Sequence, residues 1–77
     1  MGFIDRLREG SDFHKVTLVT DGFSIVPANG GRECRQEFVR IVDQALGCAS
    51  AEGYQIITHE SSRDFLGWDK AIFIRNE

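Results

Sequence analysis

A glycine-rich segment beside two arginines carries the residue types of an anion site. Gly30 and Gly31 follow Asn29 and lead into Arg32 and Arg35. Glycines before a helix expose backbone N–H groups, and the positive end of the helix dipole favours an anion there. The segment matches no P-loop or dinucleotide fingerprint. It predicts either a site for an anionic small molecule or nucleotide, or a flexible connection with solvated charges.

An enzyme built on this chain would have to use its cysteines and histidines. Cys34 falls in the first turn of a predicted helix, where the dipole favours a thiolate, but also on the apolar stripe, where a thiol is buried and inert. Cys48 lies at the edge of that stripe and is expected to pack. His14 and His59 could meet if their strands are neighbours; surface positions at strand ends are the alternative. The sequence shows no metal-ligand spacing, so no metal or cofactor is expected. It also shows no complete set of nucleophile, base and orienting residue, so an enzyme using Cys34 or His59 is only a third hypothesis.

The segment from Ser61 to Trp68 combines aromatic and charged side chains in a predicted loop. Trp and Arg are enriched at binding hot spots, and loops longer than their turn requires are often functional. Arg63, Asp64, Phe65 and Trp68 are therefore the predicted partner-binding residues. The alternative is that Phe65, Leu66 and Trp68 fold back to cap the core.

One long amphipathic helix organises the elements that would position these residues. Between Gly31 and Tyr54, apolar residues recur at three- and four-residue steps. They are Phe38, Ile41, Val42, Ala45, Leu46 and Ala49. Gly53 predicts the end of the helix because glycine takes the left-handed conformation, and Tyr54 is then placed for a Schellman contact. Phe38 and Leu46 are both expected in the core.

Four segments show the alternation or composition typical of strands, at residues 14–20, 23–26, 54–60 and 68–75. Asp21-Gly22 predicts a two-residue hairpin turn, with Leu18 opposite Ile25. Residues 1–12 hold a short amphipathic helix, which must dock on a domain of residues 13–77 or on a partner. The predicted class is α+β: an antiparallel sheet of three or four strands (ββαββ or βαββ) on one long helix, plus the short N-terminal helix.

Composition excludes several classes of protein. The chain has 77 residues and a net charge of −3 with no basic tract, so duplex nucleic acid is not an expected partner. No apolar run approaches the roughly 20 residues of a membrane span, and the N-terminus lacks the apolar centre of a signal peptide. Cys34 and Cys48 would stand about 21 Å apart on one helix, too far for a disulfide. We therefore expect a cytoplasmic protein with reduced thiols and no membrane contact.

Three short motifs resemble a known family. Phe13-His14-Lys15-Val16 resembles its opening strand, and Ala71-Ile72-Phe73-Ile74-Arg75 its closing strand. Glu52-Gly53-Tyr54-Gln55-Ile56-Ile57 resembles the helix end and second strand, usually written EGWELV. The family is the small bacterial and phage group catalogued as domain of unknown function 4177, and the similarity covers about residues 13–75. Tyr54 replaces the preferred Trp, and the hairpin and the 29–31 loop depart from the usual short connection. The resemblance implies a small α+β fold and no activity.

Both faces of the predicted sheet carry apolar residues, whereas one helix covers the middle of one face only. Val19, Val26 and one of the pairs Ile57/Ile72 or Ile56/Phe73 would face outward, with the N-terminal helix available to cover part of them. Exposed patches of this kind mark interfaces. The leading hypothesis is a non-enzymatic binding module for a protein partner, by analogy of size and charge with phage-encoded inhibitors of host proteins. Self-association as a homodimer or dimer of dimers is expected. The alternative is an oligomer that sequesters an anionic ligand.

Overall fold

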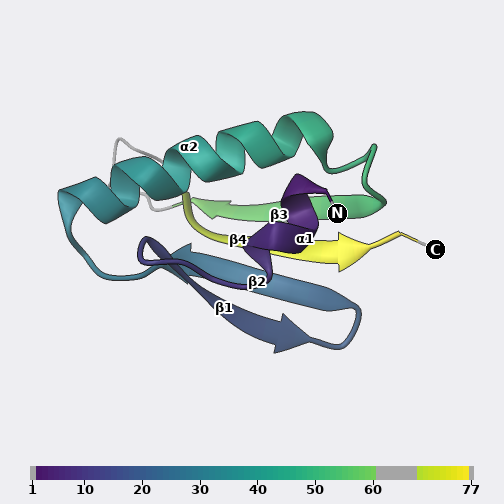
Figure 1. Cartoon of the computed structure of the whole chain (residues 1–77), viewed down its shortest axis with the longest axis horizontal. Coiled ribbons are helices and arrows are strands. Elements are labelled where there is room, and N and C mark those ends of the chain that lie inside the picture. The colour runs from purple at the N-terminus through teal and green to yellow at the C-terminus, as the bar shows by residue number, and fades with distance from the viewer. Residues whose placement is uncertain (1, 61–67, 77) are drawn as a thin grey trace.

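The computed structural model describes residues 2–60 and 68–76, and it places two helices on one antiparallel sheet (Figure 1). The elements in chain order are α1 (Phe3–Leu7), β1 (His14–Val19), β2 (Gly22–Pro27), α2 (Arg32–Cys48), β3 (Tyr54–Glu60) and β4 (Trp68–Arg75). The strand order is β1-β2-β4-β3, and each neighbouring pair is antiparallel. The predicted α+β class is confirmed, in its ββαββ form with a short N-terminal helix.

α2 forms a buried stripe because its apolar residues share one side of the helix. The buried residues are Cys34, Phe38, Ile41, Val42 and Ala45. At about 100° per residue, Leu46 lies about 80° around the helix from Phe38. Leu46 is therefore at the margin of the stripe and is 48% exposed, whereas Phe38 is fully buried. The prediction that Leu46 belongs to the core is wrong.

A glycine ends the turns that follow α2. Regular helix ends at Cys48, and turns continue to Gly53, whose φ is +84°. The N–H of Gly53 donates to the carbonyl of Ser50 at 3.1 Å, and the N–H of Tyr54 donates to the carbonyl of Ala49 at 2.8 Å. These two bonds form a Schellman motif. The predicted left-handed conformation of Gly53 is confirmed, but α2 ends at Cys48, before the predicted stop. The buried Tyr54 begins β3.

The β1–β2 hairpin differs by two residues from the predicted register. Val19 pairs with Gly22, so the turn residues are Thr20 and Asp21. A β-carbon at Gly22 would overlap the carbonyl oxygen of Phe73 on β4. Gly22 is thus required by the close approach of a neighbouring strand and not by the turn. Because the shift is two residues, each side chain keeps its predicted face.

The core lies between the sheet and the two helices. The rings of Phe23 on β2 and Phe73 on β4 stack with centroids 4.8 Å apart, and Tyr54 meets Phe23 edge-on at 6.0 Å. α1 adds Ile4 and Leu7 to the same cluster. Both helices therefore cover one face of the sheet, which we call the inner face; the opposite side is the outer face.

Candidate functional site

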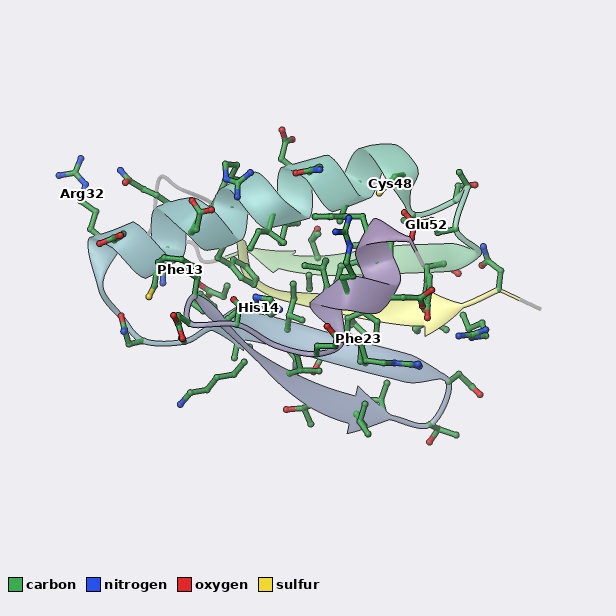
Figure 2. All side chains as sticks on the ribbon, viewed as in Figure 1. Phe13, His14, Phe23, Arg32, Cys48 and Glu52 are labelled. Carbon is green, nitrogen blue, oxygen red and sulfur yellow. The ribbon has the colours of Figure 1, made fainter. Side chains whose placement is uncertain are left out.

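The predicted anion site lies where α2 begins, and its polar groups are engaged within the chain. The N–H of Gly31 donates to the side-chain oxygen of Asn29 at 2.7 Å. Arg35 donates to the carboxylate of Asp69 on β4 at 3.2 Å. Arg32 is exposed and extends away from the rest of the chain (Figure 2). The structure therefore does not join the two arginines, which favours the alternative of a connection with solvated charges.

The two cysteines are placed for packing. Cys34 is 8% exposed, and Cys48 is half-buried near the end of α2. Burial raises the pKa of the Cys48 thiol, and the neighbouring Glu52 carboxylate raises it further. A raised pKa keeps the thiol protonated, and the thiol is a poorer nucleophile than the thiolate.

His14 is buried, contrary to the expected surface position. Its Nε2 lies 2.9 Å from the carbonyl oxygen of Leu7, and its Nδ1 lies 2.8 Å from the Oγ of Ser11. Because a carbonyl only accepts, Nε2 donates, and the ring fastens the end of α1 to the start of β1. His59 belongs to β3, and β1 and β3 are opposite edges of the sheet. The condition under which His14 and His59 could meet, that their strands are neighbours, is therefore not fulfilled.

The predicted partner-binding loop falls largely outside the described residues. Arg63, Asp64 and Phe65 lie in the segment 61–67, which the structure does not describe. Trp68 is the first residue of β4, and its backbone pairs with Glu60 of β3. Their role in binding stays a prediction from the sequence.

Polar contacts hold α1 against the inner face. The Glu52 carboxylate accepts the N–H of Ile4 at 2.9 Å, at the start of α1, where the helix dipole favours a negative charge (Figure 2). The hydroxyl of Tyr54 donates to Asp5 at 3.3 Å. With His14 at its other end, α1 is held at both ends. The expectation that α1 covers part of the outer face is therefore wrong.

The outer face has an aliphatic centre. It is formed by alternate positions of the four strands, since successive side chains of a strand point to opposite sides. Its aliphatic members in the described strands are Val19, Val26, Ile57, Ile72 and Ile74. Val19 is 43% and Ile57 is 45% exposed, and the other three are half-buried. No element among the described residues lies over this face, so it is a candidate surface for a partner.

The charge on the outer face differs from that of the whole chain. The net charge is −3, yet the described strand side chains on this face include no carboxylate. The polar residues around the aliphatic centre are Lys15, Thr17, Gln55 and Lys70. An apolar centre with a polar rim is the usual anatomy of a protein interface.

Sequence periodicity did not reveal the contacts that decide which face is covered. The Glu52–Ile4 bond joins residues 48 positions apart in the chain, and no local pattern indicates it. His14 did carry a signal, because it alternates in phase with Val16 and Leu18 on the face predicted to lie under the helix. This alternation is the one feature of the sequence that indicates the burial of His14.

Among residues 2–60 and 68–76, no three His, Cys, Asp or Glu side chains are grouped so as to hold a metal ion. No helix in this part of the chain is long and apolar enough to cross a membrane. Comparisons with protein families, curated proteins and solved structures find no match to this chain. The resemblance noted in the sequence therefore stays an expectation.

Proposed function

We propose that this protein is a non-enzymatic protein-binding module, that it binds through the outer face of its sheet, and that its partner there is a second copy of the chain. The observation that supports the proposal is the uncovered aliphatic centre, in which Val19 and Ile57 are more than two-fifths exposed. Apolar surface removed from water contributes about 25 cal/mol per Å². The outer face of a second copy is also aliphatic at its centre. It would place no strand carboxylate against the aliphatic centre of the first copy.

The relief of the outer face suits the packing of one sheet on another. In the strand register, Ser24 lies between Thr17 and Ile72, and it is 6% exposed. Gly22, two residues earlier on β2, has no side chain. The register thus places the small residues of β2 beside Ile72 and Ile74 on β4, which predicts a shallow valley along β2 next to a ridge of branched side chains. In a two-fold pair, the ridge of each copy would fit the valley of the other.

The size of the face sets the expected affinity. Strands stand about 4.8 Å apart and rise about 3.3 Å per residue, so this four-stranded sheet measures about 20 Å in each direction. The face therefore offers about 400 Å² per copy, or about 800 Å² for the pair, which is below the roughly 1,200–2,000 Å² of stable specific interfaces and in the range of weak, transient ones. We therefore expect a dimer with a dissociation constant in the micromolar range.

Sedimentation equilibrium over a concentration series that extends well above this dissociation constant tests the proposal. At the highest concentrations, the wild type is expected to approach twice the mass of the 8.7 kDa chain. Ile57→Lys puts a charge into the aliphatic centre and is expected to give a monomer. Leu46→Lys is the matched control, because Leu46 is 48% exposed against 45% for Ile57 but lies on α2. A monomeric wild type, or a dimer lost in Leu46→Lys instead, contradicts the proposal.

The other two hypotheses receive less support from the geometry. Sequestration of an anion at the start of α2 would need Arg35 to leave Asp69, its ion-pair partner at 3.2 Å. Catalysis by Cys34 would need access to a side chain that is 8% exposed.

A further inference from the structure

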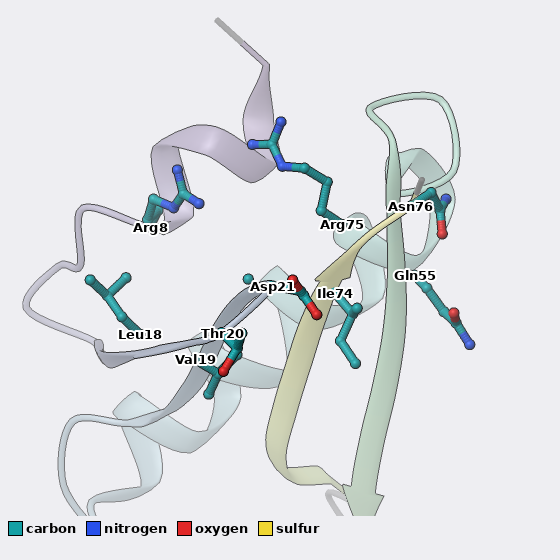
Figure 3. Close-up of a pocket in the computed structure, with 10 residues that line it drawn as sticks. Arg8, Leu18, Val19, Thr20, Asp21, Gln55, Ile74, Arg75 and Asn76 are labelled. Carbon is teal, nitrogen blue, oxygen red and sulfur yellow. The ribbon is translucent and has the colours of Figure 1, made fainter.

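We propose that the end of the sheet beside α1 is a separate binding site, which takes a ligand that joins one carboxylate to an aliphatic group. The site is an open concavity of about 1000 Å³ between α1, the β1–β2 turn and the end of β4 (Figure 3). The residues used below are Arg8, Leu18, Asp21, Arg75 and Asn76, all of which line it. The concavity also reaches Val19 and Ile74 at the edge of the aliphatic centre. The inference goes beyond the proposed dimer because the five residues that would bind the ligand lie outside that centre.

Two arginines supply the positive charge of the site. The guanidinium carbon of Arg8 lies 5.7 Å from the centroid of the Phe23 ring, and that of Arg75 lies 5.4 Å from the centroid of the Tyr54 ring. Contact with an aromatic face attracts a guanidinium and holds it in position. Figure 3 shows that the two side chains come from opposite sides of the concavity and extend toward the space between them. The charges are therefore in place before a ligand arrives.

Neither arginine has a carboxylate partner among residues 2–60 and 68–76. Arg75 donates to the hydroxyl of Tyr54 at 3.1 Å, and Arg8 is engaged by the aromatic ring beneath it. By contrast, Arg35 on α2 pairs with the carboxylate of Asp69. A guanidinium binds a carboxylate by short, charge-assisted hydrogen bonds, and the donors for such bonds remain available on Arg8 and Arg75.

Leu18 supplies the apolar part of the site. It is 71% exposed, the most of any large apolar side chain that the structure describes. Leu18 alternates in phase with Val16 toward the inner face, but it lies at the end of β1 beyond the cover of α2. An aliphatic group resting on Leu18 would remove apolar surface from water on both partners.

The acidic residues at this end restrict the charge of the ligand. Asp21 lies in the β1–β2 turn and lines the concavity (Figure 3). Asp5 accepts the hydrogen bond of Tyr54, which in turn accepts that of Arg75. Both carboxylates repel an anion, and the repulsion grows with the charge of that anion. A single carboxylate is therefore favoured over a phosphate or a polyanion.

A carboxylate joined to an aliphatic group occurs in free aliphatic acids and at the C-terminus of a peptide that ends in leucine. Two probes separate these sources: octanoate, and an N-acetylated alanyl-alanyl-leucine peptide with a free C-terminal carboxylate. Their controls are 1-octanol and the same peptide as the C-terminal amide, since each control keeps the aliphatic group and lacks the carboxylate.

NMR titration of the full chain, followed at the backbone amides of Leu18, Asp21 and Asn76, is the test. We expect saturable shifts with at least one acid probe and at least about tenfold weaker binding of its control. Arg8→Gln and Arg75→Gln should each weaken binding about threefold to tenfold. Asp21→Asn should strengthen it about twofold, because it removes a repulsive charge. The amide spectrum of each variant reports whether it is folded.

The matched control is Arg32→Gln, because Arg32 is an exposed arginine at the start of α2. Binding of octanoate alone would identify a free acid, and binding of the peptide alone would identify a chain terminus; either result supports the inference. It is overturned if the acid and its control bind equally, if Arg32→Gln weakens binding as much as Arg8→Gln, or if neither probe saturates. Should an arginine variant fail to fold, an affinity that does not fall with added NaCl overturns it. Binding of the probe should persist in Ile57→Lys. The ligand site can therefore be tested even if the protein does not form the proposed dimer.

Discussion

The inner and outer faces of the sheet are made from similar apolar residues and have different surroundings. Phe23 and Phe73 on the inner face are 0% exposed, whereas Val19 and Ile57 on the outer face are 43% and 45% exposed. Strand alternation accounts for the apolar character of both faces, but it does not choose which one the helices cover. That choice coincides with polar contacts such as Glu52 to α1. The comparison teaches that alternation makes both faces apolar, whereas contacts between residues far apart in the chain accompany the covering of only one of them.

The largest expected effect comes from emptying the inner face. Phe38→Ala removes a fully buried ring and should lower the free energy of unfolding by about 3–5 kcal/mol. Leu46→Ala, on the same helix, should cost about 1 kcal/mol or less, because Leu46 is 48% exposed. Chemical denaturation of both variants measures the difference. Equal losses would mean that the inner face is not the stabilising one.

A smaller effect is expected from the contact that docks α1. Glu52→Ala leaves the N–H of Ile4 without its carboxylate and should cost about 1–2 kcal/mol. Asp43→Ala is the control, since Asp43 is an exposed carboxylate on α2, and its cost should stay below about 0.5 kcal/mol. Urea denaturation gives both values. If the two variants are equally stable, the Glu52 contact does not hold α1 on the inner face.

Two glycines near the end of α2 should respond in opposite directions. Gly53→Ala should cost about 1 kcal/mol, because alanine is strained at a φ of +84°. Gly47→Ala should stabilise the protein by up to about 1 kcal/mol, because Gly47 is an exposed helical residue with open space around its α-carbon. Thermal unfolding of both variants measures the signs. If Gly47→Ala destabilises the protein as much as Gly53→Ala does, the claim that the Schellman motif requires glycine at position 53 is contradicted.

The smallest effect concerns the Cys48 thiol, whose pKa is raised by burial and then by Glu52. The folded state therefore binds the thiol proton more tightly than the unfolded chain does. Its contribution to stability is fully present below the unfolded pKa of about 8.5 and is lost as the pH rises through the higher folded value. In a Cys34→Ser background, the pH dependence of alkylation should give a higher pKa for native than for urea-unfolded protein. Glu52→Gln should lower the pKa of the native Cys48 thiol part of the way. An unchanged pKa would contradict the contribution of the Glu52 carboxylate.

Much of the fold could be predicted because its signals are local. The 3.6-residue period identified α2, and Gly53 identified the end of the turns that follow it. Leu46 could not be placed with certainty, because a residue at the margin of a stripe is buried only if its neighbours reach it. Gly22 was misread, because a glycine required by a close strand looks in sequence like a glycine required by a turn.

The candidate surfaces were less accessible to sequence reasoning. Alternation identified Val19 and Val26 as outward-facing, and that placement is seen in the strand register. That Arg8 and Arg75 line the same concavity depends on the strand order β1-β2-β4-β3 and on the docking of α1. Neither of these is encoded in the period of any single segment, so this second site followed only from the structure.

The central claim is that the outer face is where two copies meet. The most direct measurement mixes methyl-labelled protein with unlabelled protein and records isotope-filtered NOEs between copies. We predict intermolecular NOEs from the methyl groups of Ile57, Ile72 and Ile74 on the outer face, and none from Ile41 or Leu46 on α2. Intermolecular NOEs confined to the α2 methyl groups, or none at concentrations where the protein is a dimer by mass, would contradict the claim.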